Sequence, residues 1–124
     1  MNIKVKHINQ KHSSADGARI YIDPIWTDGA FTRFVNITEW NKEVAPSYDL
    51  WRFYGSPEKW AQFEELYDQE LNRPDKAEAV DAISAMANDG PVTLLYGNGS
   101  ELHNSANFLK TYIEKRTTTA KKAA

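Results

Sequence analysis

The chain has 124 residues, of which 41% are hydrophobic, and a formal net charge of −2. A chain of this length most simply forms one domain, and its charge balance offers no general attraction to nucleic acid or to anionic lipid. It contains no cysteine, which excludes disulfides, thiol catalysis and thiolate metal ligands.

The remaining exclusions come from single segments of the chain. No stretch is apolar over the length that a bilayer requires, and the N-terminal "MNIKVKHINQ" lacks the apolar core of a signal peptide. Three dispersed histidines, His7, His12 and His103, predict no preformed metal site. We therefore expect a cytoplasmic protein with no membrane partner, no metal and no cofactor, and nucleic acid is not an expected partner.

The first part of the chain predicts two strands. Residues 2–8 alternate apolar and polar side chains, which is typical of an edge strand with one solvated face. Residues 18–23 form a short β-branched run that Pro24 ends. Residues 24–37 are aromatic-rich and irregular, and they predict no regular element.

The middle of the chain predicts short helices followed by longer ones. Thr38 is a candidate N-cap for a helix over 39–45, and Ser47 for one that Gly55 ends. Ser56 and Pro57 then begin the clearest helix of the chain. Its apolar face is predicted at Trp60, Phe63, Tyr67 and Leu71. A weaker helix follows, with Ala77, Val80, Ile83 and Ala87 turned inward.

The last part of the chain predicts a strand and a helix. Residues 92–96 are nearly all apolar, which indicates a central parallel strand that is buried on both faces. The final helix is expected to begin near Ser100 or Glu101, and its inner face at Leu102, Ala106, Leu109 and Ile113.

The order of these elements predicts an α/β fold. We expect a small three-layer domain in which a short, mainly parallel sheet is flanked by helices. The domain is predicted over residues 1–116, and residues 117–124 are predicted to be a solvated tail.

Polar side chains follow two of the predicted strands. Ligands of open α/β sheets collect beyond the carboxyl ends of the strands, where Asp23, Tyr96 and His103 would share one rim. Each has a structural alternative: His103 can be a solvated residue of a first helical turn, and Asp23 can accept hydrogen bonds from its own turn. The predicted ligand-binding residues are Arg19, Asp23, Trp26, Tyr96, His103 and Asn104, and the candidate catalytic residues are Asp23 and His103.

Arg19 lies four residues before Asp23, on the same face of its strand. It can attract an anionic ligand, or it can form an internal ion pair with Asp23.

Four segments resemble one family in order and spacing: "DGARIYIDPIW", "EWNKEVAPSYDLWRFYG", "PEKWAQFEELYDQEL" and "GPVTLLYGNGSELHNSANFLKTYI". Over residues 3–115 the chain is similar to the YeaO-like family of small uncharacterised bacterial proteins, domain of unknown function 488. The resemblance implies a single α/β domain and no established activity.

The chain departs from this family after its second strand. Members usually read V-D-R-L-W-P-R-G where this chain reads "IDPIWTDG", so Pro24 and Asp28 replace two arginines. The loss of two positive charges would weaken any anion site at this rim.

Three functions remain open at this stage. The first is a domain that binds a small polar or anionic molecule at the strand rim. The second is a hydrolase or lyase that uses Asp23 or His103 as a general acid or base. The third is a protein-interaction module. The sequence determines neither the ligand nor the oligomeric state.

Overall fold

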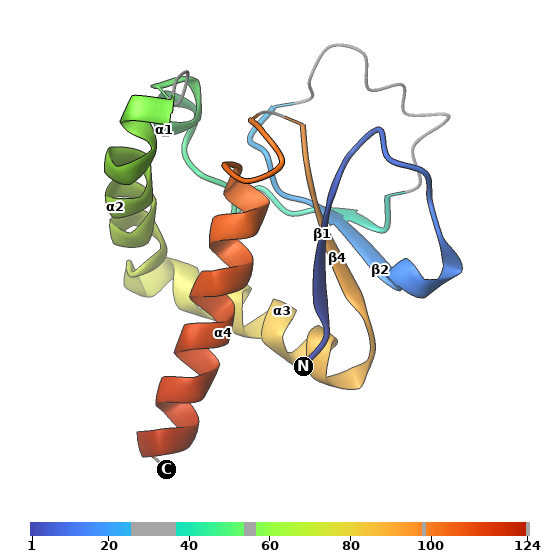
Figure 1. Ribbon diagram of the computed structural model, residues 1–124. Helices are drawn as coiled ribbons and strands as arrows, with labels where there is room; N and C mark the ends of the chain where they lie inside the picture. Colours follow the sequence, from blue (N-terminus) through green and yellow to red (C-terminus); the bar gives the residue numbers. More distant parts are fainter. Residues whose placement is uncertain (26–36, 54–56, 98, 124) are drawn as a thin grey trace.

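The computed structural model describes residues 1–25, 37–53, 57–97 and 99–123, which form a four-stranded sheet and four α-helices (Figure 1). The strands are β1 (Ile3–His7), β2 (Ala18–Tyr21), β3 (Glu39–Trp40) and β4 (Val92–Tyr96). The helices are α1 (Tyr48–Phe53), α2 (Trp60–Leu71), α3 (Ala77–Asp89) and α4 (Ser105–Ala123). Short 3₁₀ turns occur at η1 (Ser14–Asp16), η2 (Pro57–Lys59) and η3 (Pro74–Lys76).

The sheet is parallel, with strand order β1-β4-β2-β3. All five residues of β4 are buried, because this strand lies between β1 and β2 and is covered on both faces. The predicted α/β class, the edge position of β1 and the central position of β4 are confirmed. Since all strands are parallel, their carboxyl ends meet at one edge of the sheet.

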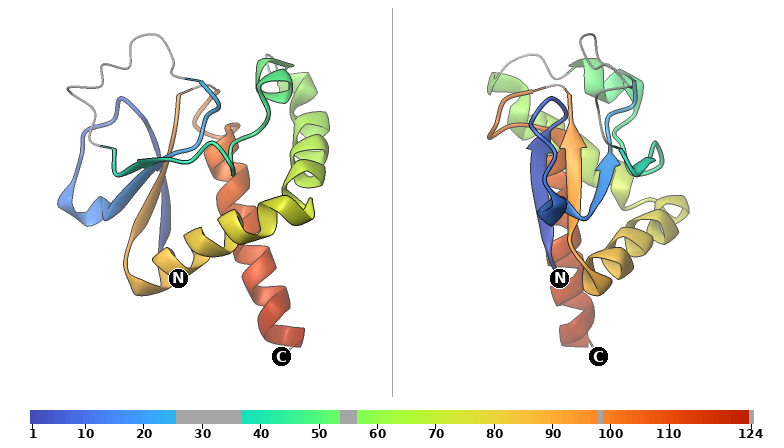
Figure 2. Two further views of the ribbon diagram at one scale, coloured as in Figure 1. Left: turned by 180° about the vertical axis from the view of Figure 1, so that it is seen from behind. Right: turned by 90° about the vertical axis from the view of Figure 1, so that its right-hand side faces the viewer.

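The described helices pack against one face of the sheet (Figures 1 and 2). Apolar side chains from alternate positions of the strands meet the inner faces of α2, α3 and α4 in one core. The strand contributions include Ile3, Ile20, Ile22, Val92, Leu94 and Tyr96. The helix contributions include Phe63, Tyr67, Leu71, Val80, Ile83, Ala87, Ala106, Leu109 and Ile113, which confirms most of the inner faces that the helical spacing predicts.

The opposite face of the sheet carries a smaller apolar cluster of Ile8, Tyr21 and Leu95. Next to it, η1 places Asp16 against the sheet, and Asp16 is 1% exposed. A capping box between Ser13 and Asp16 begins this turn.

The helix predicted over 39–45 is wrong. Glu39 and Trp40 form β3, which pairs with Ile20 and Tyr21 of β2. A helix of seven residues that stops before Pro46 has little intrinsic stability, whereas the open edge of β2 offers backbone hydrogen bonds. The amide of Thr38 donates to the carbonyl of Arg19 at 2.8 Å, and the Thr38 hydroxyl accepts from the Arg19 amide at 3.0 Å.

The start predicted for the last helix is also wrong. Helix α4 begins at Ser105, four or five residues later than expected, and Leu102 is 74% exposed instead of inward-facing. The side chain of Asn104 stops the helix from beginning earlier, because its Oδ1 accepts the amide of Asn107 at 2.8 Å as an N-cap does. At its other end α4 continues to Ala123.

Candidate functional site

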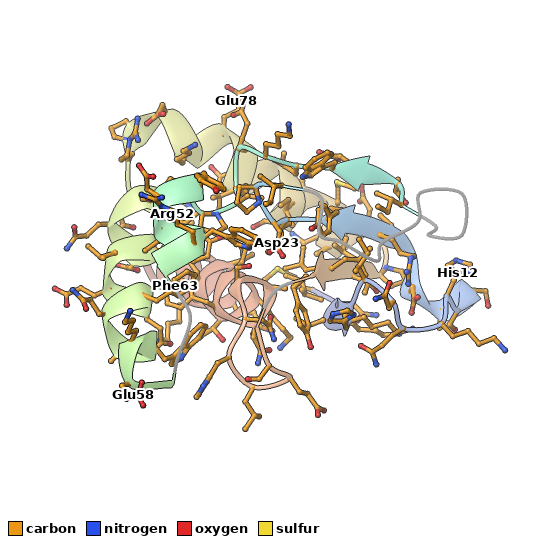
Figure 3. The ribbon with its side chains drawn as sticks, turned by 90° about the horizontal axis from the view of Figure 1, so that it is seen from above. His12, Asp23, Arg52, Glu58, Phe63 and Glu78 are labelled. Atoms are coloured by element: carbon orange, nitrogen blue, oxygen red, sulfur yellow. The ribbon has the colours of Figure 1, made fainter. Side chains whose placement is uncertain are left out.

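The carboxylate of Asp23 lies inside the fold at the carboxyl edge of the sheet, where Figure 3 shows it between the strand ends and the helices. Its side chain is fully buried. Oδ2 accepts the amide of Gly97 at 2.7 Å, and Oδ1 accepts the hydroxyl of Ser105 at 2.8 Å. Both contacts suit an ionised carboxylate, since Ser105 is the first residue of α4 and helix N-termini favour negative charge.

The turn after β2 is held by two aromatic side chains. The hydroxyl of Tyr21 donates to the carbonyl of Ile25 at 2.7 Å, and Nε1 of Trp40 donates to the carbonyl of Asp23 at 2.8 Å. The first bond holds the turn against β2, the second attaches it to β3, and both satisfy backbone carbonyls that the strand ladder leaves open.

Arg19 lies near the start of β2 and contacts η1. Its guanidinium is 2% exposed and donates to Oδ2 of Asp16 at 2.6 Å. The same carboxylate accepts Lys6 Nζ at 2.8 Å and the Ser13 amide at 3.1 Å. Burial acts to raise the pKa of Asp16, but the bonds from Lys6, Ser13 and Arg19 outweigh it and lower the pKa to about 2. This geometry is that of a structural ion pair, and its acid is Asp16 of η1, whereas the sequence predicted Asp23 as the internal partner of Arg19.

His103 and Asn104 lie in the loop that joins β4 to α4 rather than in a first helical turn. The ring of His103 stacks on that of Trp60, with centroids 4.9 Å apart and planes at 18°. Asn104 is fully buried, and its amide donates to the carbonyls of Ser100 and Glu101 at 2.9 and 3.2 Å. Asn104 therefore orders this loop and caps α4.

Tyr96 lies at the carboxyl end of β4, directly beside His7 at the end of β1. The two rings meet edge to face, with centroids 5.2 Å apart. Both line a pocket of about 480 Å³ between β1, β4 and the beginning of α4, which we call the β1–β4 pocket. Its other lining residues are Val5, Gln10, Glu101, Leu102 and Asn107.

The structure thus divides the predicted site residues among three places. Asp23 joins β2, β4 and α4, Arg19 contacts η1, and Tyr96 lines the β1–β4 pocket. His103 and Asn104 belong to the loop of residues 97–104 that supplies one wall of this pocket. Trp26 and Asp28 lie outside the described residues.

The sequence reasoning missed every lining residue of this pocket except Tyr96, namely Val5, His7, Gln10, Glu101, Leu102 and Asn107. His7 carries the signal that would have found it, because it lies next to the end of the first predicted strand, residues 2–8, much as Tyr96 ends the last. The rule that ligands collect beyond the carboxyl ends of parallel strands applies to both.

The described residues contain neither a membrane-spanning helix nor a metal-binding cluster. None of the helices there is long and apolar enough to span a bilayer. In that same part of the chain, His, Asp and Glu side chains form no cluster of three or more that could hold a metal ion.

Fold and site together define a small parallel α/β domain with a polar pocket at the carboxyl edge of its sheet. A family model described as the inactive DUF488-N3 subclade matches residues 2–124, and the chain belongs to this family. The resemblance to YeaO-like proteins that the sequence motifs indicate is confirmed.

The relatives agree with this assignment. The uncharacterized protein YeaO of Escherichia coli strain K12 is 31% identical over 114 residues, which cover 91% of this chain and 97% of the relative. The uncharacterized proteins Mb3100c of Mycobacterium bovis and Rv3073c of Mycobacterium tuberculosis are each 31% identical over 71 residues, which cover 56% of this chain and 60% of each relative. No solved structure matches the chain.

Proposed function

We propose that this protein is a binding domain for a small polar molecule and that the β1–β4 pocket is its binding site. The observation that carries the proposal is the position and volume of this pocket. It lies at the carboxyl ends of two parallel strands, where α/β sheets bind ligands, and its volume of about 480 Å³ suits a small molecule.

The chemistry of the lining supports a polar ligand. Val5 supplies an apolar wall, and His7, Gln10, Tyr96 and Asn107 supply hydrogen-bonding groups. The Nδ1 atom of His7 accepts the amide of Asn9 at 3.1 Å, which places the proton of the neutral imidazole on Nε2. Nε2 is then a donor that a ligand can use.

A second pocket, of about 580 Å³, lies between α1 and α2, and its charged side chains and Ser47 already have partners. Glu70 accepts the hydroxyl and the amide of Ser47, and Arg73 pairs with Asp75 at 3.1 Å. A ligand there would have to break these bonds, so we favour the β1–β4 pocket.

Binding is favoured over catalysis by the burial of Asp23. A general base must reach a proton of the substrate, whereas the Asp23 carboxylate is enclosed and bonded to Gly97 and Ser105. The description of this subclade as inactive supports the same choice.

The proposal is tested by NMR titration of the ¹⁵N-labelled protein with benzamide, benzamidine and benzoate. We expect at least one probe to bind with a Kd on the order of 1 mM and to shift the amides of Tyr96, Leu102 and Asn107. Asn107→Phe, which fills the β1–β4 pocket, should abolish these shifts. Gln69→Phe, which fills the α1–α2 pocket, should leave them unchanged. Shifts confined to α1 and α2, or no shifts at all, would refute the assignment.

A further inference from the structure

The hydroxyl of Tyr96 belongs to a buried side chain and is available for hydrogen bonding. Tyr96 is 5% exposed, and its ring packs against His7 and the apolar core. Within the described residues the hydroxyl makes no hydrogen bond. Its oxygen is not fully enclosed, because Nε1 of Trp51 is the buried side-chain atom there that has no partner. Because Tyr96 lines the β1–β4 pocket, its unpaired hydroxyl is a group that a ligand can meet.

Glu101 supplies negative charge to the same pocket. It lies in the loop after β4, and in the described part of the chain its carboxylate has no ion pair. The pKa of the Tyr96 hydroxyl is raised, first by burial and second by the charge of Glu101, so the two groups are close enough to interact.

The described lining contains one carboxylate and neither lysine nor arginine. The nearest lysine along α4, Lys110, is paired with Glu114 at 3.2 Å. With His7 neutral, the described lining therefore carries a formal charge of −1, which opposes an anionic ligand and favours a cationic one.

We infer that the β1–β4 pocket selects small organic cations such as amidines and primary amines, with Glu101 as the countercharge and the Tyr96 hydroxyl as a hydrogen-bond acceptor. This inference rests on the proposed function and adds the chemical class of the ligand. An amidinium suits the two acceptors because it presents several N–H donors in one plane.

The three probes named above have nearly the same shape and differ in charge, so their relative affinities test the inference. We expect benzamidine to bind about tenfold more tightly than benzoate, with benzamide between them. Glu101→Gln should weaken benzamidine about fivefold to tenfold and leave benzamide unchanged. Tyr96→Phe, which keeps the ring, should weaken benzamidine about threefold.

Glu65→Gln is the matched control, because it removes the same charge from an exposed position on α2 away from the pocket. It should leave all three affinities unchanged. Equal binding of the three probes at the Tyr96 and Asn107 amides would overturn the inference and leave the proposed function standing. The absence of binding by every probe would overturn both.

Discussion

The hydroxyl of Ser105 donates a 2.8 Å hydrogen bond to the carboxylate of Asp23, which holds the first residue of α4 against the end of β2. The other carboxylate oxygen accepts the amide of Gly97, directly after β4. One buried side chain therefore joins three elements at the edge of the sheet where the β1–β4 pocket lies.

Replacing Asp23 by Asn should lower the free energy of unfolding by about 2–3 kcal/mol. The substitution turns one of the two accepting oxygens into an NH₂ group, so either the Gly97 amide or the Ser105 hydroxyl loses its acceptor. Ser105→Ala should cost about 1 kcal/mol. Urea denaturation followed by circular dichroism measures both. Asp49→Asn is the control, since the Asp49 side chain is 85% exposed and its change should stay within about 0.5 kcal/mol. An Asp23 variant as stable as the Asp49 variant would contradict the structural role of Asp23.

The hydrogen bonds that Asp16 accepts from Lys6, Ser13 and Arg19 should make stability depend on acid pH. The pKa of Asp16 is about 2 in the folded protein against an ordinary value of 3.8. A lowered folded pKa stabilises the fold above the unfolded pKa, and this contribution is lost as the pH falls from about 4 to about 2. This pKa difference contributes about 2 kcal/mol to the free energy of unfolding at neutral pH. Urea denaturation at a series of pH values from 7 to 2 measures it.

Asp16→Asn should remove this component and flatten the acid limb of the stability curve. At neutral pH the variant should also lose about 3 kcal/mol or more, because Arg19 stays buried without its countercharge. Asp75→Asn removes an acid whose side chain is 58% exposed, and it should keep the acid dependence of the wild type. The prediction fails if the Asp16 variant shows the same acid dependence as the wild type.

Gly17 should tolerate no side chain. It has φ of +66°, and a Cβ atom there would lie 2.0 Å from the carbonyl oxygen of Pro91. Gly17→Ala should therefore destabilise the fold by more than about 2 kcal/mol, through strain and the forced separation of η1 from the start of β4. Gly90→Ala is the matched control, because a Cβ at Gly90 meets nothing within 4 Å and the backbone is extended. Thermal unfolding should show a large loss for the first variant and almost none for the second.

Asn104 should control both the stability of α4 and the order of the loop before it. Asn104→Ala removes the acceptor for the Asn107 amide and the donors to Ser100 and Glu101, which should cost about 1–2 kcal/mol. Asn104→Asp keeps the cap and loses only the donors. Hydrogen exchange should show faster exchange of the Asn107 amide in the alanine variant than in the aspartate variant. Equal protection in both would show that the cap is not what orders this end of α4.

Much of the fold could be predicted because its signals are local. The spacing of Phe63, Tyr67 and Leu71 records one face of a helix, and these three residues are buried as expected. The apolar run of β4 likewise records burial on both faces.

The errors occur where tertiary contacts outweigh local preference. Thr38 predicts the N-cap of a helix over 39–45, but Glu39 and Trp40 instead pair with the open edge of β2 as a strand. The sequence predicts Asn104 within the first turn of the last helix. In the structure its side chain bonds to the preceding loop and caps α4 instead.

The sequence by itself determined most of the element types, the parallel α/β class, the family and the edge of the sheet where polar groups gather. The element types follow from periodicity and turn residues, which act over short separations, and the family follows from its resemblance to four segments of the chain. Only the tertiary structure decided that the Asp23 carboxylate is buried and links β2 to β4 and α4 through hydrogen bonds. It also decided that Arg19 pairs with Asp16, and that His7 and Glu101 line one pocket with Tyr96. The partners of Asp23 lie 74 and 82 residues away, and a carboxylate has no pattern that selects among such distant donors until packing brings one of them within 3 Å.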